Sequence, residues 1–138
     1  LYLIAGSGAI AFEALSRGAA EVVMVESSRR LADTLLQHAQ TLGSEHHVIQ
    51  CADALSWLKQ QPGTFDLVFL DPPFGQGLIE QCCSIILETN LLNERGLVYI
   101  ESEKDLTLPS GWRIKKQTGA GNVQAMLIEP TAQESNEE

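Results

Sequence analysis

The stretch LYLIAGSGAIAFEALSRGAAEVVMVE, Leu1–Glu26, decides the fold that this sequence predicts. It reads as a strand over Leu1–Ile4, a glycine-rich loop, a helix over Ala9–Arg17 and a second strand over Glu21–Glu26. The second strand is continuously apolar up to its final glutamate, which is typical of a parallel strand covered on both faces. The stretch therefore predicts an open α/β sheet with a ligand-binding loop after its first strand.

The loop carries the spacing Gly6-x-Gly8-x-x-Ala11, and Glu26 lies 20 residues after Gly6. Glycines at such a turn let the backbone approach a ligand closely, and the amides at the start of the next helix attract negative charge. In dinucleotide-binding enzymes an acidic residue about 20 positions further on holds a ribose hydroxyl. Another adenosine-bearing cofactor would fit equally well, so the loop alone leaves the cofactor open.

The rest of the chain alternates between helical and extended segments and ends in an antiparallel pair. The segments expected after Glu26 are Ser28–Leu42, His46–Cys51, a short helix from the N-cap Asp53 through Gln60, Phe65–Leu70, Gly77–Thr89, Gly96–Glu101, Trp112–Gln117 and Asn122–Glu129. The glycines around Ala120 indicate a hairpin between the last two strands. We predict a mostly parallel sheet of about seven strands, with helices on both faces and a C-terminal antiparallel hairpin.

The composition is that of one globular domain, which we place at residues 1–130, with a disordered acidic tail at 131–138. No apolar run approaches the roughly 20 residues of a membrane span. The three cysteines form neither a metal-ligand spacing nor a disulfide framework, so we expect a reducing, cytoplasmic setting and no metal. The net charge of −9 is weak evidence against a nucleic-acid partner, because the tail supplies part of it.

Ligands of such sheets bind beyond the carboxyl ends of the strands, where the notable polar residues of this chain fall. Glu26 ends the second predicted strand and can accept two ribose hydroxyls. Asp53 follows the third and could accept from an adenine amino group, although it is a helix N-cap in either case. Asp71 ends the fourth.

The motif Asp71-Pro72-Pro73-Phe74 indicates the chemistry. Two consecutive prolines stiffen the backbone and remove two amide donors. The Asp71 carboxylate and the Pro72 carbonyl can then both accept from a planar amino group, while Phe74 stacks on the attached ring. Two acceptors favour a pyramidal nitrogen with its lone pair aimed at an electrophilic methyl group. This arrangement favours methyl transfer to an exocyclic amine, with rate supplied by positioning and electrostatics.

The motif matches [DN]-P-P-[YF] of the S-adenosylmethionine-dependent amino methyltransferases. Together with LIAGSGAIAFEALSRGA and VVMVE it resembles the bacterial RsmD family, from Leu1 to Glu103 and more loosely to Glu129. The resemblance implies a Rossmann-like methyltransferase fold and methylation of N2 of one guanine in 16S ribosomal RNA. We therefore expect S-adenosyl-L-methionine as cofactor, 16S rRNA or a small-subunit assembly particle as partner, and a monomeric enzyme.

The resemblance also assigns residues by position. It implies that the loop lines the methionine part of the cofactor, that Glu26 holds the ribose and that Asp53 holds the adenine end. It implies that the guanine is held by Asp71, the Pro72 carbonyl and Phe74, with Asp71 also beside the cofactor. The loop residues so assigned are Ala5, Gly6, Ser7 and Gly8. Glu101, in YIESE, is expected near the substrate without an assigned role.

Some positions depart from the family pattern. Tyr2 stands where the family usually has an aspartate that contacts the methionine portion or orders the loop, and Ser28 stands where it often has aspartate. Ile4 replaces a usual Phe, and Ala11-Phe12 replaces a usual Gly-Leu. The family's basic N-terminal segment is absent, so we expect an N-terminally truncated chain that folds poorly or binds RNA weakly by itself.

Three alternatives stay open at this point. The same motif group methylates adenine N6 in DNA and glutamine in proteins. The glycine spacing and Glu26 alone would suit an NAD-dependent oxidoreductase, which leaves the motif at Asp71 unexplained. A non-catalytic RNA-binding module that kept the fold gains weight from Tyr2.

Overall fold

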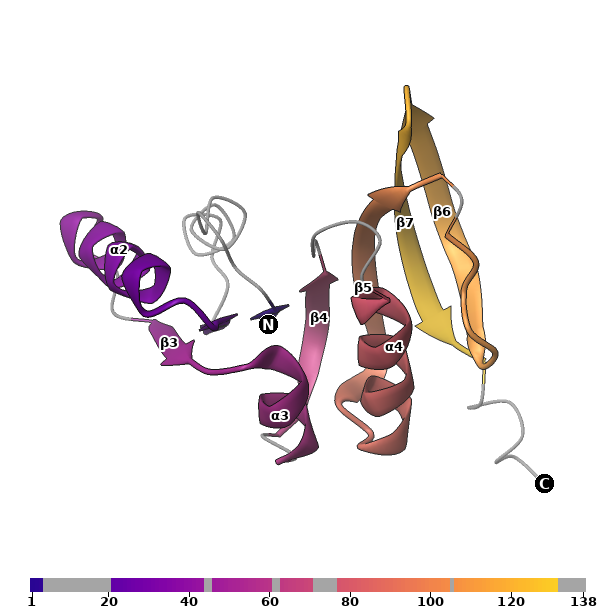
Figure 1. Ribbon diagram of the computed structural model, residues 1–138. Helices are drawn as coiled ribbons and strands as arrows, with labels where there is room; N and C mark the ends of the chain where they lie inside the picture. Colours follow the sequence, from indigo (N-terminus) through magenta and orange to yellow (C-terminus); the bar gives the residue numbers. More distant parts are fainter. Residues whose placement is uncertain (4–20, 44–45, 61–62, 71–76, 105, 132–138) are drawn as a thin grey trace. The chain divides into compact units, whose positions relative to one another are not determined.

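A computed structural model describes residues 1–3, 21–43, 46–60, 63–70, 77–104 and 106–131 (Figure 1). The chain forms two compact units, Leu1–Trp57 and Leu58–Glu138, and each contains paired strands of its own. The glycine loop, the predicted helix Ala9–Arg17, the motif at 71–74 and residues 132–138 of the predicted tail 131–138 lie outside the described residues. The placement of one catalytic domain over residues 1–130 stays a prediction.

The first unit holds three parallel strands in the order β3-β2-β1. They are β1 (Tyr2–Leu3), β2 (Val22–Glu26) and β3 (His47–Cys51). All five residues of β2 are buried, as the unbroken apolar run predicts for a strand with neighbours on both sides and cover on both faces. The strands are in register at their carboxyl ends, because Leu3 lies opposite Val25 and Glu26 lies opposite Cys51.

Helix α2 (Arg29–Thr41) follows β2 and contacts β2 and β3. Ser28 is its N-cap, since its Oγ accepts from the Leu31 amide at 3.3 Å. The residues buried against the sheet are Ala32, Leu35 and Ala39. Leu42, the last residue of the predicted segment Ser28–Leu42, is the C-cap and 65% exposed. The helix ends there because Gly43 takes a left-handed φ of +70°, which terminates the i→i+4 ladder.

The short helix α3 (Ala54–Lys59) connects β3 to the strands of the second unit. Those strands are β4 (Phe65–Leu70), β5 (Leu92–Glu103), β6 (Trp112–Ala120) and β7 (Val123–Pro130). Their order is β4-β5-β7-β6, with β4 and β5 parallel and the other pairs antiparallel. The predicted hairpin is present, but its turn is Gly121-Asn122, because β6 continues through Gly119 and Ala120.

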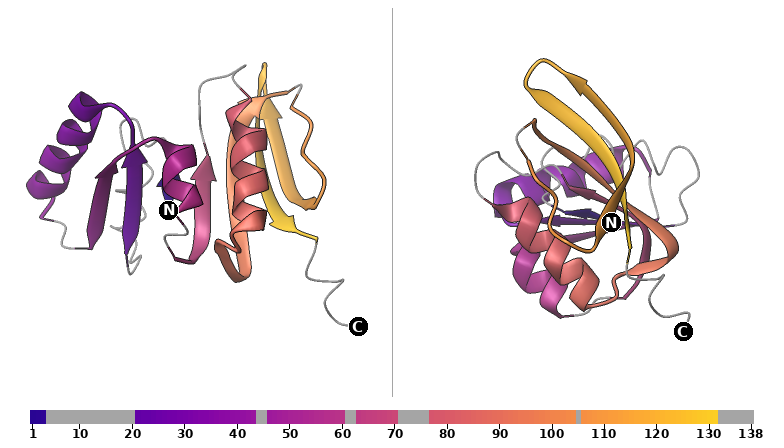
Figure 2. Two further views of the ribbon diagram at one scale, coloured as in Figure 1. Left: turned by 60° about the horizontal axis from the view of Figure 1, so that its bottom comes forward. Right: turned by 90° about the vertical axis from the view of Figure 1, so that its right-hand side faces the viewer.

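Helix α4 (Leu78–Glu88) packs along β5 (Figures 1 and 2). Its buried residues are Ile79, Cys82, Cys83, Ile85 and Ile86. Strand β5 begins earlier than the predicted Gly96, because Leu92 pairs with Phe65 before the chain bulges out over Asn93–Gly96. Regular pairing resumes at Leu97, where the alternation of buried and half-buried residues also starts. That alternation gives β5 two different faces, and the less buried one carries polar residues towards its carboxyl end.

Among the described residues no helix is long and apolar enough to cross a membrane.

Candidate functional site

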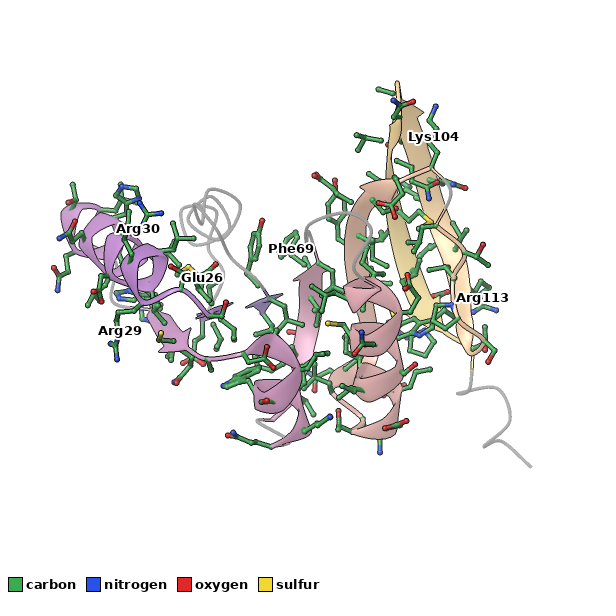
Figure 3. The ribbon with its side chains drawn as sticks, viewed as in Figure 1. Glu26, Arg29, Arg30, Phe69, Lys104 and Arg113 are labelled. Carbon is green, nitrogen blue, oxygen red and sulfur yellow. The ribbon has the colours of Figure 1, made fainter. Side chains whose placement is uncertain are left out.

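In the first unit, the notable side chain at the strand ends is that of Glu26 (Figure 3). Glu26 is the last residue of β2 and only 5% exposed. Its Oε2 accepts a hydrogen bond from the backbone amide of Ser28 at 2.9 Å. Its carbonyl accepts from the Ala52 amide at 3.1 Å, which ties the end of β2 to the residue after β3. A carboxylate held in this way keeps its orientation, which is what a ligand-binding acceptor needs.

Strand β1, which precedes the predicted glycine loop in the chain, ends beside the carboxyl end of β2. Leu3, the last residue of β1, is fully buried and in register with Val25, the residue before Glu26. Tyr2, which departs from the family pattern, is 6% exposed and packed within the sheet opposite Met24. The loop residues Ala5, Gly6, Ser7 and Gly8 themselves lie outside the described residues.

Asp53 lies just after β3 and is exposed. Its Oδ2 accepts from the Ser56 amide at 3.0 Å, so it caps the first turn of α3 as the sequence predicts. The cap uses one carboxylate oxygen, and the assignment to the adenine end of a cofactor stays a prediction. Cys51, the exposed residue that ends β3, places its Sγ 3.8 Å from the Ser27 carbonyl.

In the second unit the corresponding edge is formed by β4 and β5. Leu70, the last residue of β4, is fully buried and directly precedes the Asp71 motif in the chain. It is in register with Ile100 of β5, so Glu101 follows at the same level of the sheet. The motif residues Asp71, Pro72 and Phe74 lie outside the described residues, and their roles stay predictions.

Two aromatic residues accompany Glu101 on its face of the sheet. The Tyr99 hydroxyl donates to Glu101 Oε1 at 3.0 Å. The Tyr99 ring meets Phe69 of β4 edge-on, with centroids 5.8 Å apart and planes at 61°. The sequence placed Glu101 near the substrate, and Tyr99 was not predicted. The available signal was the Tyr-x-Glu spacing in YIESE, since residues i and i+2 of a strand share a face.

The cysteines of α4 are structural. Cys82 and Cys83 are fully buried. Burial, with smaller contributions from Cys82 and Glu80, raises the pKa of the Cys83 thiol to about 12. The thiol therefore stays protonated and unreactive at neutral pH. Among the residues that the structure describes, no three His, Cys, Asp or Glu side chains gather closely enough to hold a metal ion.

A glycine loop after the first strand, a buried glutamate ending the second and Asp-Pro-Pro-Phe after the fourth define a Rossmann-like methyltransferase. Two solved structures confirm this fold class. A candidate methyltransferase from Escherichia coli, yhhF, matches with a TM-score of 0.86 and 34% identity, covering 94% of this chain and 74% of that chain. A candidate methylase from Haemophilus influenzae matches with a TM-score of 0.85 and 39% identity, covering 94% and 85%.

The family described as Conserved hypothetical protein 95 matches residues 1–129, and the chain belongs to this family. Among its relatives, ribosomal RNA small subunit methyltransferase D of Haemophilus influenzae is 42% identical over 132 residues, or 91% of this chain and 68% of the relative. The protein of the same name from Escherichia coli is 34% identical over 132 residues, or 94% and 67%. The resemblance to the RsmD family that the sequence suggested is thereby confirmed.

Proposed function

We propose that this chain transfers a methyl group from S-adenosylmethionine to the exocyclic N2 amine of a guanine in small-subunit (16S) ribosomal RNA. The observation that carries the proposal is its membership of the family, with 42% identity to a ribosomal RNA small subunit methyltransferase D. The Asp71 motif selects an amino group as the methyl acceptor, and the family resemblance selects guanine N2. The substrate is the free 16S rRNA or a small-subunit assembly particle, and the enzyme acts as a monomer.

The described residues of the first unit fit the cofactor. When bound, S-adenosylmethionine supplies an electrophilic methyl group on its sulfonium. Glu26 would hold the ribose, because its carboxylate is nearly buried and oriented by the Ser28 amide. A carboxylate accepts two vicinal hydroxyls well, since it offers two oxygens. Asp53 would accept from the adenine amino group, and the loop Ala5–Gly8 would lie along the methionine portion.

The motif after β4 would hold the methyl acceptor. The target guanine must leave its stack to reach a pocket, as bases do in other enzymes that modify them. Asp71 and the Pro72 carbonyl accept the two N2 hydrogens and so turn the nitrogen lone pair towards the methyl group, while Phe74 stacks on the base. The proton that N2 loses passes to Asp71 or to water.

Substitution of Asp71 tests this assignment. Asp71→Ala removes one of the two acceptors, and we expect methyl transfer from tritiated S-adenosylmethionine to 16S rRNA to fall by about 100- to 1000-fold, the usual loss for a group that positions or stabilises the reacting atoms. Asp71→Asn is the matched control. It keeps an acceptor oxygen at the same position and should retain measurable transfer.

Calorimetry separates chemistry from cofactor binding. S-Adenosylhomocysteine should bind Asp71→Ala and the wild type with affinities within about threefold, because most cofactor contacts lie elsewhere. NADH should give no heat with either. Normal methyl transfer by Asp71→Ala would contradict the catalytic assignment, and binding of NADH alone would contradict the proposed function.

A further inference from the structure

We propose that Glu101 recognises the N1–H group of the target guanine and that Tyr99 positions its carboxylate for this contact. The inference rests on the proposed function and deepens it. It names the residue that would distinguish guanine from other purines that carry an amino group.

The register of the parallel pair β4 and β5 locates Glu101 in the sheet. Leu70 lies opposite Ile100, and the chain continues from Leu70 into the Asp71 motif. Glu101 is the residue after Ile100, so it lies one residue beyond the Leu70–Ile100 pair. The parallel pairing of β4 and β5 ends at Leu70 and Ile100, and ligands of such sheets bind beyond the carboxyl ends of parallel strands, so Glu101 lies at the edge where we propose that the base binds.

The surroundings of the Glu101 carboxylate leave it able to accept a further hydrogen bond. Glu101 is half-buried, and among the described residues its hydrogen-bond donor is the Tyr99 hydroxyl, on Oε1 at 3.0 Å. No lysine or arginine of these residues forms an ion pair with it. Its neighbour on β7 is Ala125, which offers no side-chain donor. A partly desolvated carboxylate with one neutral donor retains acceptor capacity that a ligand N–H can use.

Tyr99 is itself held in place. The edge-on contact with Phe69 across the β4–β5 pair limits the rotation of the Tyr99 ring. The fixed ring points its hydroxyl along the strand to the residue two positions on, which lies on the same face. Phe69 lies near the end of β4 (Figure 3). Tyr99 is therefore a positioning residue, and Glu101 is the group that would touch the substrate.

The chemistry of the base explains why a carboxylate is useful here. The Watson–Crick edge of guanine presents an N1–H donor beside the N2 amine. If Asp71 and the Pro72 carbonyl take the two N2 hydrogens, N1–H remains for a further acceptor. A carboxylate accepts only, so it binds N1–H strongly and is repelled by the N1 lone pair of adenine or 2-aminopurine. A site that hydrogen-bonds one ligand typically rejects strongly an analogue that leaves the polar group of the site unpaired.

The experiment compares two substrates that share the methyl-accepting amine. The guanine that the wild-type chain methylates is first located in 16S rRNA by mass spectrometry. It is then replaced by 2-aminopurine, which keeps the N2 amine but has a lone pair at N1. The measured quantity is the ratio of kcat/KM for the guanine RNA to that for the 2-aminopurine RNA. Any intrinsic difference between the two amines cancels when this ratio is compared between variants.

Glu101→Gln should lower the guanine preference by about 10-fold or more, since a glutamine amide can donate to the N1 lone pair and the charge-assisted bond is lost. Glu103→Gln is the matched control. It removes the same charge two residues further along the same face of β5, and it should keep the wild-type preference. An unchanged preference in Glu101→Gln would overturn the inference. A wild-type chain that methylates no guanine would instead overturn the proposed function.

Tyr99→Phe provides the second, independent variant. It removes the hydroxyl and keeps the ring against Phe69, so folding should be preserved. We expect the guanine preference to fall by about threefold to tenfold, with S-adenosylhomocysteine affinity unchanged. In the Glu101→Gln background the same change should have little further effect on the preference, because both residues act through one contact. Full additivity, or a loss of stability with the preference intact, would show a purely structural role for Tyr99.

Discussion

Single carboxylates at strand ends carry most of the functional information in this chain, and Glu26 shows why. Glu26 is only 5% exposed at the end of an apolar strand. Burial of a carboxylate costs free energy, because desolvation disfavours the charged form. The Ser28 amide donates a hydrogen bond to its Oε2. The backbone therefore fixes the orientation of this carboxylate, which suits the ribose-binding role that we propose for it.

Glu26→Gln should weaken S-adenosylhomocysteine binding by about 10- to 100-fold, because hydrogen bonds to a charged acceptor are stronger than those to an amide. Glu21→Gln is the matched control. Glu21 is exposed, directly before β2 and at the opposite end of the strand from Glu26, so its substitution should leave the affinity unchanged. Calorimetry measures both variants. Equal affinity of Glu26→Gln and wild type would refute the ribose-binding assignment.

At the scale of helices and strands, local patterns predicted the elements well where the pattern and the pairing agree. The apolar run of β2 and the N-cap Asp53 are such cases. The start of β5 was missed, because the bulge over Asn93–Gly96 depends on its pairing with β4 and leaves no periodic signal. The end of β6 was predicted too early, at Gln117, because glycines are typical of turns. Here, however, Gly119 lies in the strand under the Lys104 side chain, with 3.2 Å between its ideal Cβ position and Lys104 Cε.

In the candidate site, too, features with a local sequence signal could be predicted and features set by another strand could not. Glu26 and Glu101 could be located from the sequence, because each directly follows an apolar run, although β5 continues to Glu103. The spacing in YIESE places Tyr99 on the face of Glu101, but their hydrogen bond could not be predicted, because the direction of the Tyr99 hydroxyl is set by the Phe69 ring on another strand. Sequence spacing gives the face on which a side chain lies, whereas its rotamer depends on contacts between distant parts of the chain.

The N-cap of α2 gives a prediction at this scale. Ser28→Ala removes the acceptor of the Leu31 amide and should lower the free energy of unfolding by about 1 kcal/mol, measured by urea titration. The Ser28 backbone amide, which donates to Glu26, is retained. S-Adenosylhomocysteine affinity should therefore stay within about threefold of wild type. Ser84→Ala, at an exposed position inside α4, is the control and should not destabilise the chain. Equal stability of Ser28→Ala and wild type would contradict the capping role.

At the scale of the whole molecule, the distribution of charge matters more than its sum. The net charge is −9, with 18 acidic and 9 basic residues. Four of the nine basic residues lie between positions 104 and 116, and Arg113 among them is paired with Glu129 at 3.1 Å. The other three are Lys104, Lys115 and Lys116. Figure 3 labels Lys104, which directly follows β5, and Arg113, which lies on β6. Phosphate contacts by an acidic protein require such a local excess of cations.

We expect these three lysines to supply most of the salt-dependent affinity of the chain for 16S rRNA. Each phosphate contact on single-stranded RNA contributes about −0.7 to the slope of log K against log salt concentration, so replacing all three by glutamine should make the slope shallower by about 2. Filter binding between about 50 and 300 mM KCl measures the slope. The double variant Lys59→Gln and Arg95→Gln removes two positive charges away from this group and should leave the slope unchanged. An unchanged slope in the triple variant would show that the RNA backbone binds elsewhere on the chain, because counterion release follows the cations that actually meet phosphate.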